Sequence, residues 1–495
     1  MLPTTIHRRQ FVLGPGPWRE YPDWAVLQLP GCGVLSFCPT LPVEVVADAG
    51  GTTWALLGVA LQSDPARLDP SAEIAVAPTA MVPQLGTTWS GRWALIGGGK
   101  VYPDAAGLLG CYFWNQPPRG RSAACWVSSS SALLGRAAAE NGSSRNLHAL
   151  AHECGMDWFP PPWSSFSAVG RLLPSQLLDL SQGRAQPRSW LPDVAPRGSY
   201  EQTVGEVAQQ LVTSLGRLAS RLESQTVWVP LTGGFDSRLV LAAALQAGLP
   251  VRTYTNYRAR MSIADLELPE RVARTAGVPH EWHRPGRPLP HAEREYDQHS
   301  AGETAGVDRG YFARGQWDFA GPRDCVLRGG GFEVGRCYYY RRFATIPGSA
   351  PPPAATIAEG LREPPGTPAQ AALAEWIATA EQSRVPGLDW RDRLYLEQRL
   401  AGWLSAVEQS LDLAFPERVH IANSAATYSL LLGLPEDVRA SSQHQRDLIA
   451  LLFPPLAKLP FNPPEEAFGQ LSRIRYRIRQ GPRAFLRSAL ARFGI

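Results

Sequence analysis

The chain has 495 residues, 44% of them hydrophobic and 19% charged, which is the composition of a soluble globular protein of about two domains. Its net charge of +4 is too small to argue for nucleic acid, and no apolar run approaches the ~18 residues of a membrane span. Seven scattered cysteines without C-x-x-C spacing exclude a zinc site and a disulfide framework. Because no signal-peptide pattern is present, we expect a cytoplasmic protein with reduced thiols.

The first half of the chain, residues 1–195, is predicted to be an all-β or α+β domain. Short apolar runs at 24–29, 53–59, 92–96 and 123–127 alternate with turns rich in Gly, Pro and Asp. A Pro-rich stretch at 187–196 marks the boundary with a second domain, residues 200–495. That domain is predicted to begin with a helix over 200–222, in which apolar residues recur at helical spacing.

The most informative segment follows this helix. An apolar strand at 227–231 leads into Thr232, Gly233, Gly234, Phe235, Asp236, Ser237 and Arg238, and a helix-forming run at 239–247 stops at Gly248. The glycines let the backbone turn and approach a ligand, and the N–H groups at a helix start favour an anion. Asp236 or Ser237 can cap that helix, and Asp236 suits a phosphate-bound Mg²⁺. We call residues 232–238 the cradle and predict that it binds pyrophosphate, although a Gly-Gly pair can also be only a tight turn.

The cradle is not a Walker A loop, because no lysine follows the glycines. It resembles the S-G-G-x-D-S loop of the PP-loop ATP pyrophosphatases, with Thr232 in place of the first serine. That family cleaves ATP between the α and β phosphates and forms an adenylated intermediate. Further along the chain, a strand at 251–255 and a helix at 265–275 predict a doubly wound parallel sheet, with its ligand at the carboxyl ends of the strands.

The rest of the carboxyl half is predicted to be largely helical. Residues 390–450 have a mostly helical pattern, whereas 347–368 contain too many prolines to pack regularly and are expected to form a surface loop or linker. The tail from Leu471 carries seven arginines between apolar residues. It is either a solvated terminal helix or a docking surface for an acidic partner or RNA.

Other motifs, in the same order along the chain, resemble the asparagine synthetase family. In the amino half these are G-R-W-A-L-I at 91–96 with D-A-A-G at 104–107, the serines and Leu134 of 128–134, and residues 160–173. The resemblance implies a degenerate Ntn-hydrolase-like β sandwich of the glutaminase type. Glutamine-using members carry a cysteine directly after the initiator methionine, but here Leu2 follows Met1. We therefore expect no glutamine hydrolysis, as in the related enzymes that close β-lactam rings or lasso peptides.

In the carboxyl half, the resemblance implies an α/β domain of the PP-loop (adenine nucleotide α-hydrolase-like) kind with a helical carboxyl-terminal part. Asp265 and His280 resemble a second nucleotide-side segment, although Asp265 could be only a helix N-cap. The stretch 326–336 occupies the place of the family's acidic loop and puts Glu333 where a metal-binding Asp belongs. The family's other two acids fall on Gly330 and Val334, so a glycine-rich turn with one surface Glu is the alternative.

Two further segments are compared with the family. Tyr395, Arg399 and Trp403 are expected to share one face of a helix, with Arg399 on the substrate side. Residues 445–462 resemble the family's terminal stretch, in which a lysine stabilises the adenylated intermediate. Lys458 is the candidate lysine, and a surface lysine is the alternative.

Together these residues predict an ATP-dependent, AMP-forming amide-bond ligase that needs no glutamine, most sharply a lasso-peptide-type macrocyclase. A small-molecule amide synthetase is equally consistent, and a non-catalytic ATP-binding scaffold or PP-loop chemistry on RNA are the alternatives from other classes. The expected partners are a peptide or small-molecule carboxylate and amine, and a leader-peptide-binding protein, but no membrane or nucleic acid. The expected cofactors are ATP and Mg²⁺. Catalytic roles are assigned to Glu333, Lys458 and Arg238, metal binding to Asp236 and Glu333, and nucleotide binding to Leu231, Thr232, Gly233, Gly234, Asp236, Ser237 and Thr255.

Overall fold

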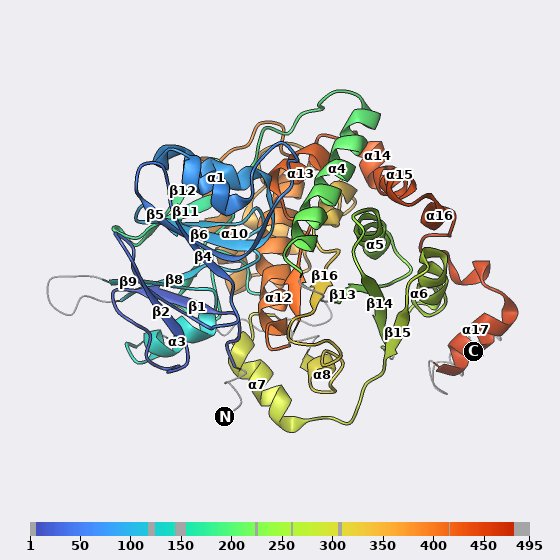
Figure 1. Ribbon diagram of the computed structural model, residues 1–495, viewed down its shortest axis with the longest axis horizontal. Coiled ribbons are helices and arrows are strands. Elements are labelled where there is room, and N and C mark those ends of the chain that lie inside the picture. The colour runs from blue at the N-terminus through green and yellow to red at the C-terminus, as the bar shows by residue number, and fades with distance from the viewer. Residues whose placement is uncertain are drawn as a thin grey trace.

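The computed structural model describes residues 6–116, 124–142, 144, 155–222, 226–258, 261–304, 309–414 and 416–479. Two six-stranded sheets come from the amino half and one five-stranded sheet from the carboxyl half. Figure 1 shows the antiparallel sheets on one side of the molecule, the parallel sheet on the other, and α12 (Ser405–Leu411) between them. The predicted succession of an α+β part and an α/β part with added helices is therefore observed.

The two amino-terminal sheets are antiparallel throughout. The first has the order β10-β8-β9-β1-β3-β2 and the second the order β12-β11-β7-β6-β5-β4. The strands of the first sheet are β1 (Phe11–Gly14), β2 (Ala25–Leu29), β3 (Gly33–Phe37), β8 (Tyr112–Gln116), β9 (Ala124–Ser128) and β10 (Gly170–Arg171). Those of the second are β4 (Val43–Ala47), β5 (Thr53–Gln62), β6 (Trp89–Gly97), β7 (Lys100–Pro103), β11 (Gln176–Asp179) and β12 (Arg184–Pro187).

These sheets pack face to face as a sandwich. Leu13 and Leu35 of the first sheet share one buried cluster with Leu57 and Ile96 of the second. Because successive side chains of a strand point to opposite faces, the neighbouring residues form separate clusters under helices on the outside. Those helices are α1 (Pro70–Val76) and α2 (Val82–Leu85) on the second sheet and α3 (Ser131–Ala139) on the first.

The parallel sheet has the order β15-β14-β13-β16-β17. Chain order therefore runs outward in both directions from β13, and this switch point lies between β13 and β16. In open sheets of this kind ligands bind outside the carboxyl ends of the strands at the switch point. The strands are β13 (Val227–Pro230), β14 (Val251–Asn256), β15 (His280–His283), β16 (Cys325–Leu327) and β17 (Glu417–Val419).

Both faces of the parallel sheet are covered. Val229 and Leu231 enter a large core with α4 (Tyr200–Ala219), α5 (Asp236–Gln246) and α15 (Gln443–Leu452). Trp228 and Tyr254 pack on the opposite face against Phe319. The sheet is thus doubly wound, as predicted, and the helix that follows β14 is α6 (Ile263–Ala276).

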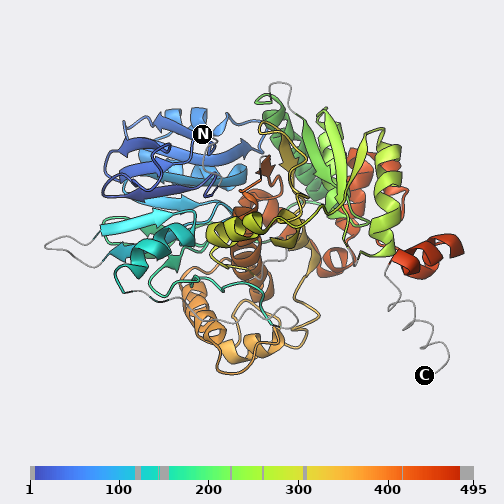
Figure 2. The ribbon, with the colours of Figure 1, turned by 90° about the horizontal axis from the view of Figure 1, so that it is seen from below.

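Most of the remaining helices lie beside and between the sheets, whereas α17 (Gln470–Arg479) projects from one end of the molecule beyond α6, as Figures 1 and 2 show. The remaining helices are α7 (Pro290–Ser300), α8 (Arg309–Phe312), α9 (Ala354–Gly360), α10 (Pro368–Gln382), α11 (Trp390–Leu394), a π-helix (Tyr395–Leu404), α13 (Ala425–Leu432), α14 (Glu436–Ala440), α16 (Pro454–Ala457) and α17 (Gln470–Arg479). Short 3₁₀ turns are η1 (Thr79–Met81), η2 (Gly86–Thr88), η3 (Phe332–Arg336) and η5 (Glu465–Ala467).

Two local predictions are wrong. The expected loop at 347–368 contains α9, because its Ile357 and Ala358 are buried in a core shared with Trp376. Within the region expected to be helical, residues 417–419 form β17, the outer strand of the parallel sheet. Of the arginine-rich tail, residues 470–479 form α17, and the positions after 479 lie outside the described residues.

The amino and carboxyl halves are joined by buried polar contacts. Arg92 on β6 pairs with Asp412 at the end of α12, with both side chains almost fully buried. Main-chain and amide groups of 420–423 also contact Gly91. The six cysteines among the described residues are free, and Cys154 lies outside that part of the chain. None of the described helices has the length and apolar character needed to cross a bilayer.

Candidate functional site

The cradle lies where the sequence predicts, between β13 and α5. The helix begins at Asp236, three residues earlier than the predicted run, and the residue at its N-cap position is Phe235. The prediction that Asp236 or Ser237 caps the helix is wrong, because Ser237 turns back and its Oγ accepts from Thr232 N at 3.2 Å. The hydroxyls of Thr232 and Ser237 lie 3.0 Å apart. The first N–H groups of α5 have no partner within the helix, which makes this end attractive to an anion.

Gly233 is needed because α6 packs against it. A Cβ at this position would lie 2.8 Å from the Cβ of Ala264, whereas a Cβ at Gly234 would meet nothing closer than 3.5 Å. Gly233 N donates to Asp265 Oδ1 at 2.8 Å, and Gly233 O accepts from Asn462 N at 2.9 Å. Asp265 is therefore not the N-cap of α6, a position taken by Ser262, and instead holds the cradle against that helix.

A cavity of about 150 Å³ opens beside the cradle, at the carboxyl ends of β13 and β14. This volume accommodates only part of a nucleotide, since whole-ligand pockets are typically several hundred Å³. Leu231 and Thr255, both predicted to bind the nucleotide, lie next to each other there, and Thr255 Oγ1 donates to Leu231 O at 2.8 Å. The lining residues are Pro230, Leu231, Thr232, Tyr254, Thr255, Asn256, Arg258, Met261, Asp265, Trp317 and Arg328.

The tertiary structure brings the two predicted metal ligands to one cluster. Asp236 begins α5 and Glu333 lies on η3, the turn that follows β16 on the other side of the switch point. Arg336 lies between them, with its Nη2 3.3 Å from Asp236 Oδ2 and 3.6 Å from Glu333 Oε1. Gln445 Nε2 donates to Asp236 Oδ1 at 2.7 Å, and Tyr395 OH donates to Glu333 Oε2 at 3.1 Å.

The electrostatics of this cluster are unfavourable for a second negative charge. Burial and the neighbouring charge of Glu333 raise the pKa of Asp236 to about 7, against the opposing effects of Arg336 and Gln445. Asp236 therefore titrates near neutral pH, where added positive charge would favour its ionised form. A pKa displaced this far, next to a cavity, is typical of functional sites.

The residues present do not fit a protein-held Mg²⁺ in this arrangement. Mg²⁺ requires a near-octahedral shell of oxygen ligands at about 2.0–2.1 Å. The carboxylate oxygens that would share such an ion face the guanidinium of Arg336, which supplies positive charge but no ligand atom. Among the described residues there is also no group of three or more His, Cys, Asp or Glu side chains placed to hold a metal.

Arg238, to which the sequence assigns a catalytic role, is not among the residues that line the cavity beside the cradle. Its side chain is fully buried, and its guanidinium donates to the carbonyl groups of Leu456, Leu459 and Pro460. It also lies over the ring of Phe461, which stacks on Phe235 of the cradle. Through these contacts Arg238 holds the segment after α16 against the cradle, so we describe it as a positioning residue.

Lys458, the predicted intermediate-stabilising lysine, lies at the end of α16 and is exposed. A cation that stabilises a reaction intermediate works best in a site shielded from water, because water weakens its field. The exposed position matches the alternative of a surface lysine. Arg336 is the cation that the structure places against Asp236.

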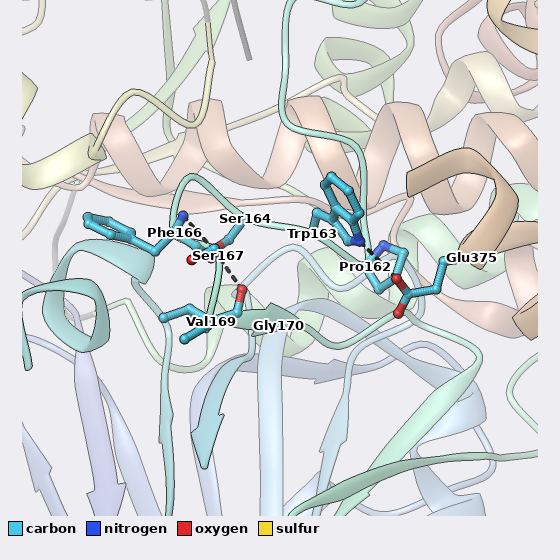
Figure 3. A pocket seen from close by; sticks show the side chains of 9 residues that line it. Pro162, Trp163, Ser164, Phe166, Ser167, Val169, Gly170 and Glu375 are labelled. Carbon is cyan, nitrogen blue, oxygen red and sulfur yellow. Dashed lines mark hydrogen bonds between the residues drawn. The ribbon is translucent and has the colours of Figure 1, made fainter. Parts of the chain in front are cut away.

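A second cavity, of about 380 Å³, shares no lining residue with the one beside the cradle. It lies where residues 162–170 meet α10, and Figure 3 shows its walls. Glu375 is the ionisable side chain on these walls, and one of its oxygens accepts from Trp163 Nε1 at 2.8 Å. Ser164 is likewise satisfied by Val169 O. Among the described lining residues, Glu375 and Ser164 thus each bond to a neighbour in the wall of this cavity.

Sequence reasoning missed the roles of three residues in the cluster. In the sequence, Arg336 and Gln445 stand only within segments that resemble the asparagine synthetase family, and Tyr395 only on a predicted helix face, whereas the structure brings all three to the cluster. That helix is a π-helix, a rare geometry that is frequent at functional sites. Arg399 and Trp403 do contact each other, with the guanidinium 3.9 Å from the ring centroid. The available signal for Arg336 is an arginine three residues after Glu333 in the same loop.

Comparisons with known proteins add little to this geometry. No protein-family model and no curated protein sequence matches the chain. Among solved structures, it is similar to a glutamine-dependent NAD+ synthetase from Acinetobacter baumannii in complex with adenosine diphosphate, at 18% sequence identity and a TM-score of 0.18. The match covers 32% of this chain and 30% of that chain. An overlap this small carries no argument for function.

Proposed function

We propose that the chain is an ATP-dependent, AMP-forming amide-bond ligase. It would adenylate a substrate carboxylate and couple the product to an amine. The observation that carries this proposal is the position of the cradle. The Gly-Gly turn, the start of α5 and the cavity at Leu231 and Thr255 meet at the carboxyl end of β13, the strand that borders the switch point of the parallel sheet.

Each part of the site has a defined task in this proposal. The cavity takes the nucleoside part of ATP, and the N–H groups at the start of α5, with Thr232 and Ser237, bind the departing pyrophosphate. A carboxylate oxygen attacks the α phosphorus and releases pyrophosphate. The amine then attacks the acyl carbon, and AMP and a proton leave. Most of the rate enhancement would come from positioning and charge neutralisation.

Mg²⁺ is proposed to arrive as part of the nucleotide. As long as Arg336 lies between Asp236 and Glu333, these carboxylates are paired with a cation already. Their role toward the metal is therefore secondary to their contact with Arg336. Glu333 remains a candidate catalytic residue, because Tyr395 orients one of its oxygens and the residue lies on the turn after β16, next to the switch point.

The amine is proposed to come from the substrate and not from glutamine. The residues that lead into β1 fill the contact between the halves, with Arg9 paired to Glu417 and Gln10 donating to Asp412. His7 is also buried and stacks on His299. These contacts support a structural role for the glutaminase-like half.

Within the class of amide-bond ligases, the most specific proposal is a lasso-type peptide macrocyclase. The alternative in the same class is a small-molecule amide synthetase. The proposal of a larger substrate is supported by one exposed aromatic ring, Tyr338, next to the buried Tyr395 that contacts Glu333. Tyr338 is 48% exposed and lies 4.9 Å from Tyr395, between ring centroids. A peptide cyclase would also be expected to have a leader-peptide-binding partner protein.

The second candidate is a scaffold that binds ATP without using it. One observation favours it: the carboxylates expected to serve the metal are both paired with Arg336. The two candidates differ in turnover, because only a ligase releases AMP and pyrophosphate in a carboxylate-dependent way.

The deciding experiment is a hydroxylamine trap. Purified protein is incubated with ATP, Mg²⁺ and pools of peptides and small carboxylic acids, and pyrophosphate and hydroxamates are measured. We expect pyrophosphate release with a matching carboxylate, lowered at least about 100-fold by Asp236→Ala. Asp297→Ala, which removes an exposed carboxylate that also pairs with an arginine, is the control and should keep full activity. ATP binding without release from any pool would favour the scaffold.

A further inference from the structure

The loop after β16 places one arginine against both carboxylates of the site. Nη2 of Arg336 is the atom nearest to Asp236 Oδ2, at 3.3 Å, and to Glu333 Oε1, at 3.6 Å. One guanidinium nitrogen thus lies within ion-pair distance of two acids that come from opposite sides of the switch point. A shared divalent ion would have to occupy the same space.

The remaining oxygen of each acid is bound by a neutral donor. Gln445 holds Asp236 Oδ1, and Tyr395 holds Glu333 Oε2. The carboxylates are therefore oriented so that their other oxygens converge on Arg336. This is the arrangement expected of a site for one positive charge, with an arginine in that place.

The turn that carries Arg336 is held by close packing. Gly331 has a φ of +109°, which side-chain-bearing residues rarely adopt, and a Cβ on Gly335 would lie 2.8 Å from His444 Nε2. The cluster itself stays open to a ligand, since the side chains of Asp236, Arg336 and Glu333 are 21%, 25% and 28% exposed. Arg336 is therefore held on a closely packed turn while its side chain remains accessible to an incoming anion.

We propose that Arg336 takes the place of a protein-held divalent metal ion. In the nucleotide-free protein it pairs with both Asp236 and Glu333, and in the complex it pairs with the pyrophosphate part of the nucleotide. The identity of that anion rests on the proposed function, whereas the occupation of the cation site does not. The free protein then has no divalent-cation site between these carboxylates.

The first test measures Mn²⁺ binding by electron paramagnetic resonance, without nucleotide. Wild type should bind no Mn²⁺ at this place. Arg336→Met should gain one site, at least about tenfold tighter than any site in wild type, because two carboxylates are left facing each other. The double variant Arg336→Met with Asp236→Asn should lose that site again.

The matched control is Arg309→Met. Arg309 also bridges two acids, Glu293 and Asp297, but all three side chains are about 40–50% exposed, at 41%, 38% and 54%. Water screens such a pair, so the control should gain no comparable site. Thermal unfolding of each variant shows that it is folded.

The second test measures binding of inorganic pyrophosphate by calorimetry with a chelator present. Arg336→Met should weaken binding about tenfold or more, and Arg336→Lys should recover most of it. Tight Mn²⁺ binding by wild type that Asp236→Asn abolishes would overturn the proposal, as would unchanged pyrophosphate affinity in Arg336→Met. The wild-type measurement stands even if the variant does not fold. Failure of the hydroxylamine trap alone would contradict the ligase and leave the cation assignment standing.

Discussion

Two clusters of opposite charges in this protein look alike in composition and differ in environment. Between the halves, Arg92, Asp412, Arg418 and Glu408 form a chain of ion pairs in which each side chain is at most 2% exposed. At the cradle, Arg336 pairs with Asp236 and Glu333, and about a quarter of each side chain is exposed. The first cluster joins the halves, and the second lies open at a switch point.

Their pKa values differ in the same way. Burial alone would raise the pKa of Glu408, but Arg328, His420 and Arg418 hold it well below its ordinary value. Burial and Glu333 raise the pKa of Asp236 to about 7, and one arginine does not offset them. The cluster between the halves thus has two arginines for its two carboxylates, whereas the cradle cluster has one arginine for two carboxylates, and Asp236 holds its proton more tightly. Burial with matched charges therefore distinguishes the structural contact, whereas partial exposure leaves the side chains of the cradle cluster accessible to a ligand.

The largest effect is expected for Asp412→Ala, which tests whether the buried cluster between the halves stabilises the fold. It leaves Arg92 buried without its carboxylate, takes away one of the two carboxylates that pair with Arg418, and removes the acceptor of Gln10. We expect a loss of about 3–5 kcal/mol in the free energy of unfolding, measured with urea. Asp236→Ala, measured alongside, should lose less than about 1 kcal/mol or gain stability. Equal losses in the two variants would remove the distinction.

The two regions should also respond to pH with opposite signs. His299 lies in the contact between the halves, where its Nδ1 accepts from His7 N and its Nε2 donates to Gln409 O. Burial is the main cause that lowers its pKa from 6.5 to about 4. The folded protein therefore binds fewer protons than the unfolded chain between these values, so acidification from pH 6.5 to 4 destabilises it through this group.

Asp236 acts the other way. Its pKa rises from 3.8 to about 7 on folding, so the folded protein binds more protons between these values, and acidification from pH 7 to 4 stabilises it through this group. Relative to wild type, His299→Gln should gain stability at pH 5 compared with pH 7.5, and Asp236→Asn should gain it at pH 7.5 compared with pH 5. Each change should be about 1–2 kcal/mol in urea unfolding at the two pH values. The same sign in both variants would contradict the assignment.

Substitution of the two cradle glycines tests whether close packing against α6 holds the cradle in place. In Gly233→Ala the new methyl group would press on Ala264 of α6, which should cost about 1–3 kcal/mol of stability and weaken ATP binding. Gly234→Ala is the matched control, because its new Cβ meets only ordinary contacts, and its stability should change by less than about 0.5 kcal/mol. Thermal unfolding and calorimetry measure both effects.

The smallest effect is expected for Lys458→Ala. Since Lys458 is exposed at the end of α16, its removal should change pyrophosphate release by less than about twofold. Arg336→Met, assayed in parallel, should have the larger effect. A hundredfold loss for Lys458→Ala would restore the lysine to the catalytic role that the family resemblance implies.

Much of the fold was readable from the sequence because it depends on local pattern. The runs predicted as strands at 53–59 and 92–96 became β5 and β6, and the strand, Gly-Gly turn and helix of the cradle are formed by neighbouring residues. The strand at 417–419 was missed because three residues carry too little periodicity, and α9 was missed because the prolines around it dominate its composition.

The sequence alone therefore predicts the cradle, the alternating strands and helices of a parallel sheet, and the position of the cradle at the end of a strand. The tertiary structure alone decided which side chains meet there. Gln445 reaches Asp236 across 209 positions of the chain, and Arg336, not Lys458, is the cation beside it. Local backbone preferences act within a few residues, whereas the occupant of a charge site depends on how distant elements pack, and no short pattern encodes that choice.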